Sequence, residues 1–271
     1  MKVIFHCWAN FTIMKLEMKH FGELLFAFTQ KEIKARYKNA VLGFLWMFLN
    51  PVIQMLVMGF VFSLIFRFGI KDYYLFLFTG LLPWNFFALS LNKATPSIVY
   101  ERSLIQKSSF PREVIPLSIV LSNFFHLLIS LVLLLIFLGV TGKWQIFYPI
   151  NFLLFVISLI FLLIFTAGFS LITSSLNVFW RDVNFFTQAL VLIWFYATPI
   201  LYPILVIPDR LRTIFYLNPL SGIFVSFQKA IINHGEFPFK ILLIQFLIII
   251  FIFTFGINLF KNRAKYFSDW L

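Results

Sequence analysis

Long runs without a charged residue restrict the folds that are open to this chain. Six of them occur along its 271 residues. About 20 apolar residues in a helix are enough to cross the ~30 Å hydrocarbon layer of a bilayer. The six runs are 40–66, 73–92, 114–142, 149–176, 183–208 and 241–260. The sequence therefore predicts an all-α integral membrane protein with six transmembrane helices.

The composition points to the same class of protein. Hydrophobic residues make up 61% of the chain and charged residues only 12%, whereas soluble domains carry about 25% charged residues. We expect one transmembrane domain over residues 1–271. It would comprise a cytoplasmic or interfacial N-terminus at 1–39, a six-helix membrane region at 40–260 and a cytoplasmic tail at 261–271.

The N-terminal segment has the pattern of an interfacial helix. Phe21, Leu24, Leu25 and Phe28 follow the i, i+3, i+4, i+7 spacing of one helix face. A helix with one apolar face and several lysines is expected to lie on the cytoplasmic leaflet. The alternative is a disordered basic leader.

The stretch 213–228 is uncharged, but it is short for a span and is interrupted by Asn218, Pro219 and Gly222. Irregular backbone at membrane depth is tolerated only where protein or water covers it. We therefore predict a re-entrant pair of half-helices between the fifth and sixth spans.

Basic residues set the orientation. With six spans, 14 of the 22 Lys and Arg residues fall on the side that holds both termini, and seven fall on the opposite side. Cytoplasmic loops carry the excess of Lys and Arg, so both termini are expected inside. The formal charge of +12 is explained by this bias and by contact with anionic lipids; no nucleic-acid partner is expected.

The sequence offers little for catalysis within the chain. The six runs contain no Asp or Glu, and Gly142 and Lys143 are not preceded by the glycine of a phosphate-binding loop. A pump built from this chain would therefore take its energy from a separate subunit. The alternative is a membrane-embedded enzyme of lipid-linked glycan assembly, which would need paired carboxylates or a metal cluster at one membrane face. The ten acidic residues are scattered, and the single Cys7 offers no metal cluster.

Several short motifs occur in a characteristic order. They are KEIKARYK at 31–38, LGFLW at 42–46, Asn50-Pro51, GLLPWNFF at 80–87, LIQKSSFPRE at 104–113, WRDV at 180–183, TPILY at 198–202 and LNPL at 217–220. Together they resemble the polysaccharide-exporting permeases of the ABC-2 type, which serve O-antigen, capsule and teichoic acid export. The resemblance covers about residues 30–220.

This resemblance implies a permease subunit of an ATP-driven exporter that moves a lipid-linked polysaccharide across the bacterial inner membrane. It implies a permease homodimer around a conduit, with two copies of an ATPase subunit docked on the cytoplasmic face. Mg-ATP would be held by that ATPase, so no cofactor and no metal are expected in this chain.

The resemblance also suggests which residues couple the permease to its ATPase. Residues 97–113 would form a short helix followed by an extended arm seated in an ATPase groove, with Phe110 as its apolar anchor. The expected coupling residues are Glu101, Arg102, Lys107, Phe110, Arg112 and Glu113, with Arg181 and Asp182 as a second contact. Interface energy concentrates in a few aromatic and Arg side chains, so Phe110→Ala or Arg112→Ala is expected to weaken association by roughly 1–3 kcal/mol.

Aromatic rings are the expected lining of the glycan path, because sugar C–H faces stack on them without being held by charge. The candidates are Trp46, Trp84, Phe87, Trp194, Tyr196 and Tyr202, with Tyr216, Asn218 and Pro219 as an outer gate. The alternative for each ring is a place against lipid, a neighbouring helix or the interfacial belt.

The predicted topology can be tested by labelling. In a background without Cys7, single cysteines at Ser108 and Lys143 should react with a membrane-impermeant thiol reagent from opposite sides of the membrane. Labelling of both from the same side would contradict the six-span arrangement.

Overall fold

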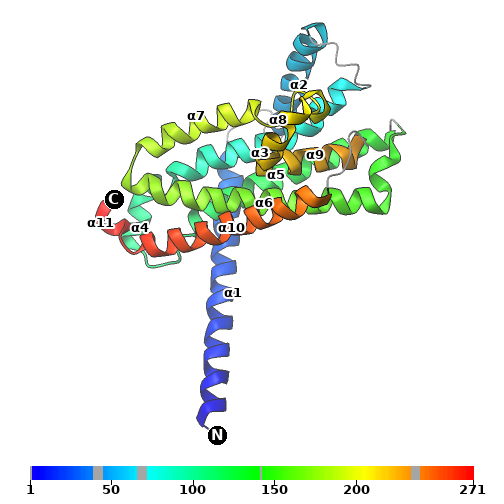
Figure 1. Ribbon diagram of the computed structural model, residues 1–271. Coiled ribbons are helices and arrows are strands. Elements are labelled where there is room, and N and C mark those ends of the chain that lie inside the picture. Colours follow the sequence, from blue (N-terminus) through cyan, green and yellow to red (C-terminus); the bar gives the residue numbers. More distant parts are fainter. Residues whose placement is uncertain (1, 39–44, 66–71, 141, 233–238) are drawn as a thin grey trace.

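The computed structural model describes residues 2–38, 45–65, 72–140, 142–232 and 239–271, and every regular element in these ranges is a helix (Figure 1). Four helical segments are long and apolar enough to cross a membrane: Tyr73–Tyr100, Val114–Val140, Pro149–Phe179 and Leu243–Ala264. The apolar helices Phe48–Leu64 and Pro219–Ile232 are shorter. The prediction of an all-helical membrane protein is thus confirmed at this level.

The elements follow one another without strands in the described ranges. They are α1 (Lys2–Tyr37), α2 (Trp46–Ile65), α3 (Tyr73–Tyr100), α4 (Arg102–Lys107), α5 (Val114–Val140), η2 (Trp144–Phe147), α6 (Pro149–Phe179), α7 (Asp182–Tyr196), η3 (Ile204–Val206), α8 (Asp209–Leu217), α9 (Pro219–Ile232), α10 (Phe239–Ala264) and α11 (Phe267–Trp270).

The long helices alternate in direction, so their connections gather at two ends of the bundle (Figure 1). We call one the α4 end; it comprises residues 101–113, 180–182 and 261–271. The other, the α8 end, comprises residues 72, 142–148 and 197–219, and there Lys143 Nζ lies 2.5 Å from Asp72 Oδ2. The described parts of the loops predicted to lie on opposite sides of the membrane therefore lie at opposite ends of the bundle. Loop residues 67–71, 141 and 233–238 are outside the described ranges.

Helix α1 is continuous and crosses the direction of the bundle helices, with its N-terminal part extending away from them (Figure 1). It runs without a break through Thr29, whose hydroxyl donates to the Leu25 carbonyl at 2.7 Å. The N-terminal segment is therefore helical in the structure, and the alternative of a disordered leader is not observed.

The expected fifth span is not a single helix. Helix α7 stops at Tyr196 after 15 residues, about 22 Å at the ordinary helical rise. Pro199 and Pro203 follow; proline cannot donate a backbone hydrogen bond, and it disfavours helix at the residue before it. The uncharged sequence thus continues to residue 208, whereas helix α7 ends at Tyr196. The beginning of the first expected span, residues 40–44, lies outside the described ranges.

Regular structure extends further than expected in two places, at the end of α3 and at the C-terminus. Helix α3 continues past Lys93 and Pro96 to Tyr100, and its 28 residues span about 42 Å. At the other extreme of the chain, α11 folds back onto the bundle so that Phe267 and Leu271 are buried. Residues 261–271 are therefore part of the packed structure in this chain, where a simple tail was expected.

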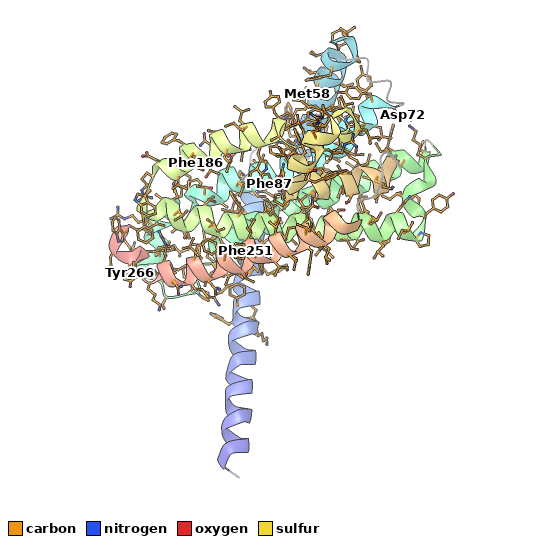
Figure 2. All side chains as sticks on the ribbon, in the orientation of Figure 1. Met58, Asp72, Phe87, Phe186, Phe251 and Tyr266 are labelled. Carbon is orange, nitrogen blue, oxygen red and sulfur yellow. The ribbon has the colours of Figure 1, made fainter. Side chains whose placement is uncertain are left out.

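Phenylalanine fills both the interior and the outer surface of the bundle. Phe87 lies within it, whereas Phe186 on α7 and Phe251 on α10 lie on outer faces (Figure 2). Phe87 is fully buried and the other two are 67% exposed. Apolar side chains facing outward on this scale mark a surface that contacts lipid or another protein.

Helices α6 and α10 approach each other through two glycines. A Cβ atom added to Gly168 would lie 2.7 Å from the Phe253 Cα, and one added to Gly256 would lie 2.5 Å from the Gly168 carbonyl oxygen. Both obstacles are backbone atoms, which cannot rotate away. Small residues permit such close contact between membrane helices, where packing replaces the hydrophobic effect as the source of association.

We predict that Gly168→Ala lowers the melting temperature of the detergent-purified protein, because overpacking of this kind costs about 1–3 kcal/mol. The control is Gly22→Ala on α1, where nothing lies within 4 Å of an added Cβ. An unchanged melting temperature for Gly168→Ala would show that the two helices can separate without cost.

Candidate functional site

The α4 end is fastened to α1 by one ion pair and one ring contact. Lys31 Nζ lies 2.6 Å from Glu101 Oε1, and the Phe28 and Phe110 ring centroids are 5.7 Å apart. Phe28 and Lys31 are three residues apart, so both project from one side of α1. Two of the predicted coupling residues thus contact the N-terminal helix of their own chain.

The C-terminal segment holds the same loop from another side. The Arg112 guanidinium donates to the Ala264 carbonyl and, at 2.6 Å, to the Ser268 hydroxyl. Ala264 is the last residue of α10, and carbonyls at a helix C-terminus lack an intrahelical donor. An arginine there satisfies the carbonyl and interacts favourably with the helix dipole.

Arg263 secures the connection between α6 and α7. Its guanidinium carbon lies 5.2 Å from the ring centroids of both Phe179 and Trp180. Phe179 also packs against Phe267 and Trp270 of the C-terminal segment. The spacing of Phe267, Trp270 and Leu271 is that of one helix face, the signal by which sequence reasoning could have found this packing.

The predicted coupling residues therefore fall into two groups. Those with exposed side chains are Arg102, Lys107, Arg181 and Asp182; those that are half-buried are Glu101, Phe110, Arg112 and Glu113. The expected short helix is present as α4, but the arm after it is only partly extended. Backbone hydrogen bonds from Val114 to Pro111 and from Ile115 to Arg112 form a turn there, because the chain must reverse into α5.

Three of the predicted conduit rings lie together in the interior. The Trp84 ring centroid is 5.4 Å from that of Phe87, and the Phe87 centroid is 5.5 Å from that of Trp194. Trp84 and Phe87 are buried. Edge-to-face and tilted ring pairs of this kind stabilise a core beyond the area they bury.

The other three conduit candidates lie apart from this cluster. Trp46 is exposed and lines a cavity beside α2, whereas Tyr196 is exposed at the end of α7. Tyr202 is half-buried and its hydroxyl donates to the Tyr196 carbonyl at 2.7 Å. The six rings thus occupy three separate environments within one chain.

Asn218 organises the α8 end. Its Oδ1 accepts the Trp194 indole N–H at 2.9 Å and the Leu220 backbone N–H at 3.1 Å. Its Nδ2 donates to the Ala197 carbonyl at 3.2 Å and to the Thr198 hydroxyl at 3.1 Å. One amide thereby joins the end of α7, the turn after it and the start of α9, where an Asn side chain before a helix is a favoured cap.

Further side chains satisfy the backbone around Asn218. The Tyr73 hydroxyl donates to the Leu201 carbonyl at 2.7 Å, the Gln228 amide to Pro199 at 3.3 Å and the Gln245 amide to Tyr216 at 3.4 Å. Tyr216, Asn218 and Pro219, the predicted gate residues, are all half-buried at the junction of α8 and α9. The predicted break at Asn218-Pro219 is present, and Gln228 and Gln245 are contributors that the sequence pattern did not reveal.

A polar cavity of about 620 Å³ lies between the end of α1 and helices α2, α3 and α5. Arg36 and Lys93 are on its wall together with His126 and several amide side chains. Basic residues in membrane segments are expensive and usually functional, and this was the signal available for Lys93. In the described ranges, no group of three or more His, Cys, Asp or Glu residues is placed to hold a metal ion.

Four helical segments that are long and apolar enough to cross a bilayer, with shorter apolar helices beside them, define a multi-pass membrane protein. The chain belongs to the ABC-2 type transporter family, whose profile matches residues 23–232.

Three named relatives are similar over nearly the whole chain. An O-antigen export system permease protein RfbA of Klebsiella pneumoniae is 35% identical over 255 residues, which is 93% of this chain and 96% of that protein. A second protein of this name from Klebsiella pneumoniae is 35% identical over 258 residues, with the same coverage. The protein of this name from Myxococcus xanthus is 32% identical over 255 residues, covering 93% of this chain and 97% of its own length.

Asn218→Ala is expected to destabilise the protein, because it removes four hydrogen bonds, two of them to the buried residues Thr198 and Leu220. At about 1 kcal/mol for a typical bond, with losses shared among neighbours, the total is about 2–4 kcal/mol. The melting temperature of the purified protein measures it. Asn262→Ala, at an exposed position on α10, is the matched control, and equal melting temperatures for the two variants would contradict the role given to Asn218.

Proposed function

We propose that this chain is the permease half of an ATP-driven exporter that moves a lipid-linked polysaccharide of the O-antigen type across the bacterial inner membrane. The observation that carries the proposal is the near full-length similarity to three proteins named as O-antigen export permeases. The described helices fit a subunit that forms a path and leaves ATP hydrolysis to a partner.

The proposed topology has six spans with both termini in the cytoplasm. Its support is the grouping of loops at two ends of the bundle (Figure 1) and the twofold excess of basic residues on the side of the α4 end. Helix α2 and the short α7 would be the first and fifth spans. Helices α8 and α9 would be the re-entrant pair, closed by Asn218. Helix α1, which crosses the bundle direction, would lie along the cytoplasmic surface.

The α4 end would dock the ATPase. Two permeases would pair around the conduit, and two ATPase subunits carrying Mg-ATP would bind at their cytoplasmic ends. Arg102, Lys107, Arg181 and Asp182 present exposed charges for this contact. The four half-buried residues would hold the loop in position; they are Glu101, Phe110, Arg112 and Glu113. The first three contact α1 or the C-terminal segment.

That arrangement offers a route for force. Movement of α4 by the ATPase would be passed to α1 through the Lys31–Glu101 pair and to α10 through Arg112. Helix α10 packs closely on α6 through Gly168 and Gly256. A push at one loop would therefore reach two long helices at once.

The six aromatic candidates are proposed to form or support the wall of the glycan path, with the α8–α9 junction as its outer gate. Exposed Trp46 and Tyr196 offer ring faces at the surface of a single chain, where a second permease would complete the wall. Buried Trp84, Phe87 and half-buried Trp194 would support the wall from behind. Tyr202 would stand between these groups at the gate.

The function is tested by complementation. In a host whose own O-antigen permease gene is deleted, this chain and its ATPase should restore surface glycan, and without it the lipid-linked glycan should accumulate on the cytoplasmic side. Loss of the lipid-linked glycan itself in the absence of the chain would indicate the enzyme of glycan assembly.

Charge reversal at the docking surface should separate permease from ATPase. The double variant Lys107→Glu with Arg181→Glu is expected to recover about tenfold less ATPase on co-purification. Two cations proposed to face the ATPase become anions, and like charges placed across an interface cost affinity. Arg210→Glu, an exposed cation on α8 at the opposite end, is the matched control. Undiminished recovery with the double variant would place the ATPase elsewhere.

A further inference from the structure

The polar cavity beside Arg36 has walls of two kinds. Phe86, Leu89 and Leu127 form apolar wall, whereas Asn85, Asn123 and Ser130 present hydrogen-bonding groups. Its volume of about 620 Å³ is within the range of cavities that take a small molecule. An occupant with both an apolar and a polar portion would match both walls.

The charge on this wall is positive. Arg36 and Lys93 both line the cavity, and none of its described lining residues is Asp or Glu. Two acidic residues, Glu32 and Glu101, line an adjoining pocket of about 280 Å³ together with Lys93. Glu32 thus offsets part of the charge from one side, while the main cavity faces two cations.

Arg36 is held in place on the cavity wall. Its Nη2 donates to the Asn123 Oδ1, and the Asn123 Nδ2 donates in turn to the Ser90 hydroxyl at 3.2 Å. Asn123 and Ser90 are buried, so this chain links the guanidinium to α5 and α3. A planar guanidinium fixed by a buried amide is suited to recognise phosphate oxygens.

In the proposed topology, the two cations lie at the depth of lipid headgroups. The uncharged part of α3 begins at Tyr73 and ends at Asn92, which is about 30 Å at the ordinary helical rise and equals the hydrocarbon thickness. Lys93 is therefore at the boundary on the side of the α4 end. Helix α1, which carries Arg36, crosses the bundle at that level (Figure 1).

We propose that this cavity binds the phosphate-bearing headgroup of a lipid, namely the carrier of the transported glycan, with Arg36 and Lys93 on the phosphate oxygens. The apolar wall would take the first part of the carrier chain, and the amides would face the first sugar. This assignment rests on the proposed export function and names the part of the substrate that this site recognises.

Two kinds of membrane lipid could supply such a phosphate group: a prenyl carrier phosphate and an ordinary anionic phospholipid. The test uses the full-length chain purified in detergent and native mass spectrometry to count bound molecules. The probes are farnesyl diphosphate, farnesol and dihexanoyl phosphatidylglycerol.

The variants are Arg36→Gln, Lys93→Gln and Arg36→Lys, each checked for monodisperse elution. The control is Lys34→Gln, which removes an exposed cation from α1 two residues from Arg36.

Farnesyl diphosphate should bind with about tenfold lower affinity to Arg36→Gln and to Lys93→Gln, as expected on loss of a charge-assisted hydrogen bond. Lys34→Gln should bind as the unaltered chain does, and Arg36→Lys should retain part of the affinity. Farnesol should bind weakly to all of them. Equal affinities of both Gln variants and the unaltered chain would overturn the site. Phosphatidylglycerol binding as tightly as farnesyl diphosphate, with the same losses, would overturn the assignment to the carrier.

Complementation separates this inference from the function on which it rests. If the unaltered chain restores surface glycan and both Gln variants do so equally well, the export function stands and the headgroup site falls. If the unaltered chain restores none, the proposed function falls, whereas the binding losses still decide whether Arg36 and Lys93 hold a lipid phosphate.

Discussion

The need to satisfy backbone hydrogen bonds outside regular helices is the constraint on which the α8 end depends. In hydrocarbon, each unsatisfied N–H or C=O costs several kcal/mol, so irregular chain persists only where protein covers it. Between Tyr196 and Pro219 the described chain leaves helical geometry repeatedly. Side chains satisfy the backbone there: Asn218, Gln228, Gln245 and the Tyr73 hydroxyl all donate to backbone carbonyls. These donors come from α3, α9, α10 and the α8–α9 junction, so the irregular segment exists only when several helices are assembled around it.

The α4 end is held together by contacts of a different kind. Here the connections are made by charged and aromatic groups: Lys31 with Glu101, Arg112 with the end of α10, and Arg263 with two rings. Exposed Arg102 and Lys107 remain at the surface. One end of the bundle thus uses its polar side chains to support irregular backbone, and the other leaves charged side chains exposed.

The sequence was sufficient where local chemistry decides the outcome. The apolar runs predicted the long helices, and the Asn-Pro pair at 218 and 219 predicted the break between α8 and α9. It failed where contacts between distant residues decide. Lys93 was expected to end the second span, but α3 continues because the side chain faces a cavity that α1 and α5 complete. The extent of α7 was overestimated because apolar character outlasts the helix at Pro199.

The candidate site shows the same division. The family resemblance suggested the coupling residues, but their exposure depends on α1 and α11, which are remote in sequence. Trp84, Phe87 and Trp194 were chosen as individual rings, and only the fold shows that they form one cluster. Arg36 appeared only as a member of the motif at 31–38, because its contact with Asn123 joins residues 87 positions apart.

The Arg112 contacts also determine when the α4 end can be completed. Its partners Ala264 and Ser268 follow it by 152 and 156 residues. During ribosomal synthesis, α3, α4 and α5 emerge long before α10 exists. The loop at 101–113 therefore lacks the contacts of Arg112 until α10 has entered the membrane. Only a chain that has inserted all of its long helices presents this loop in its final form, so the surface proposed for the ATPase also reports that membrane insertion is finished.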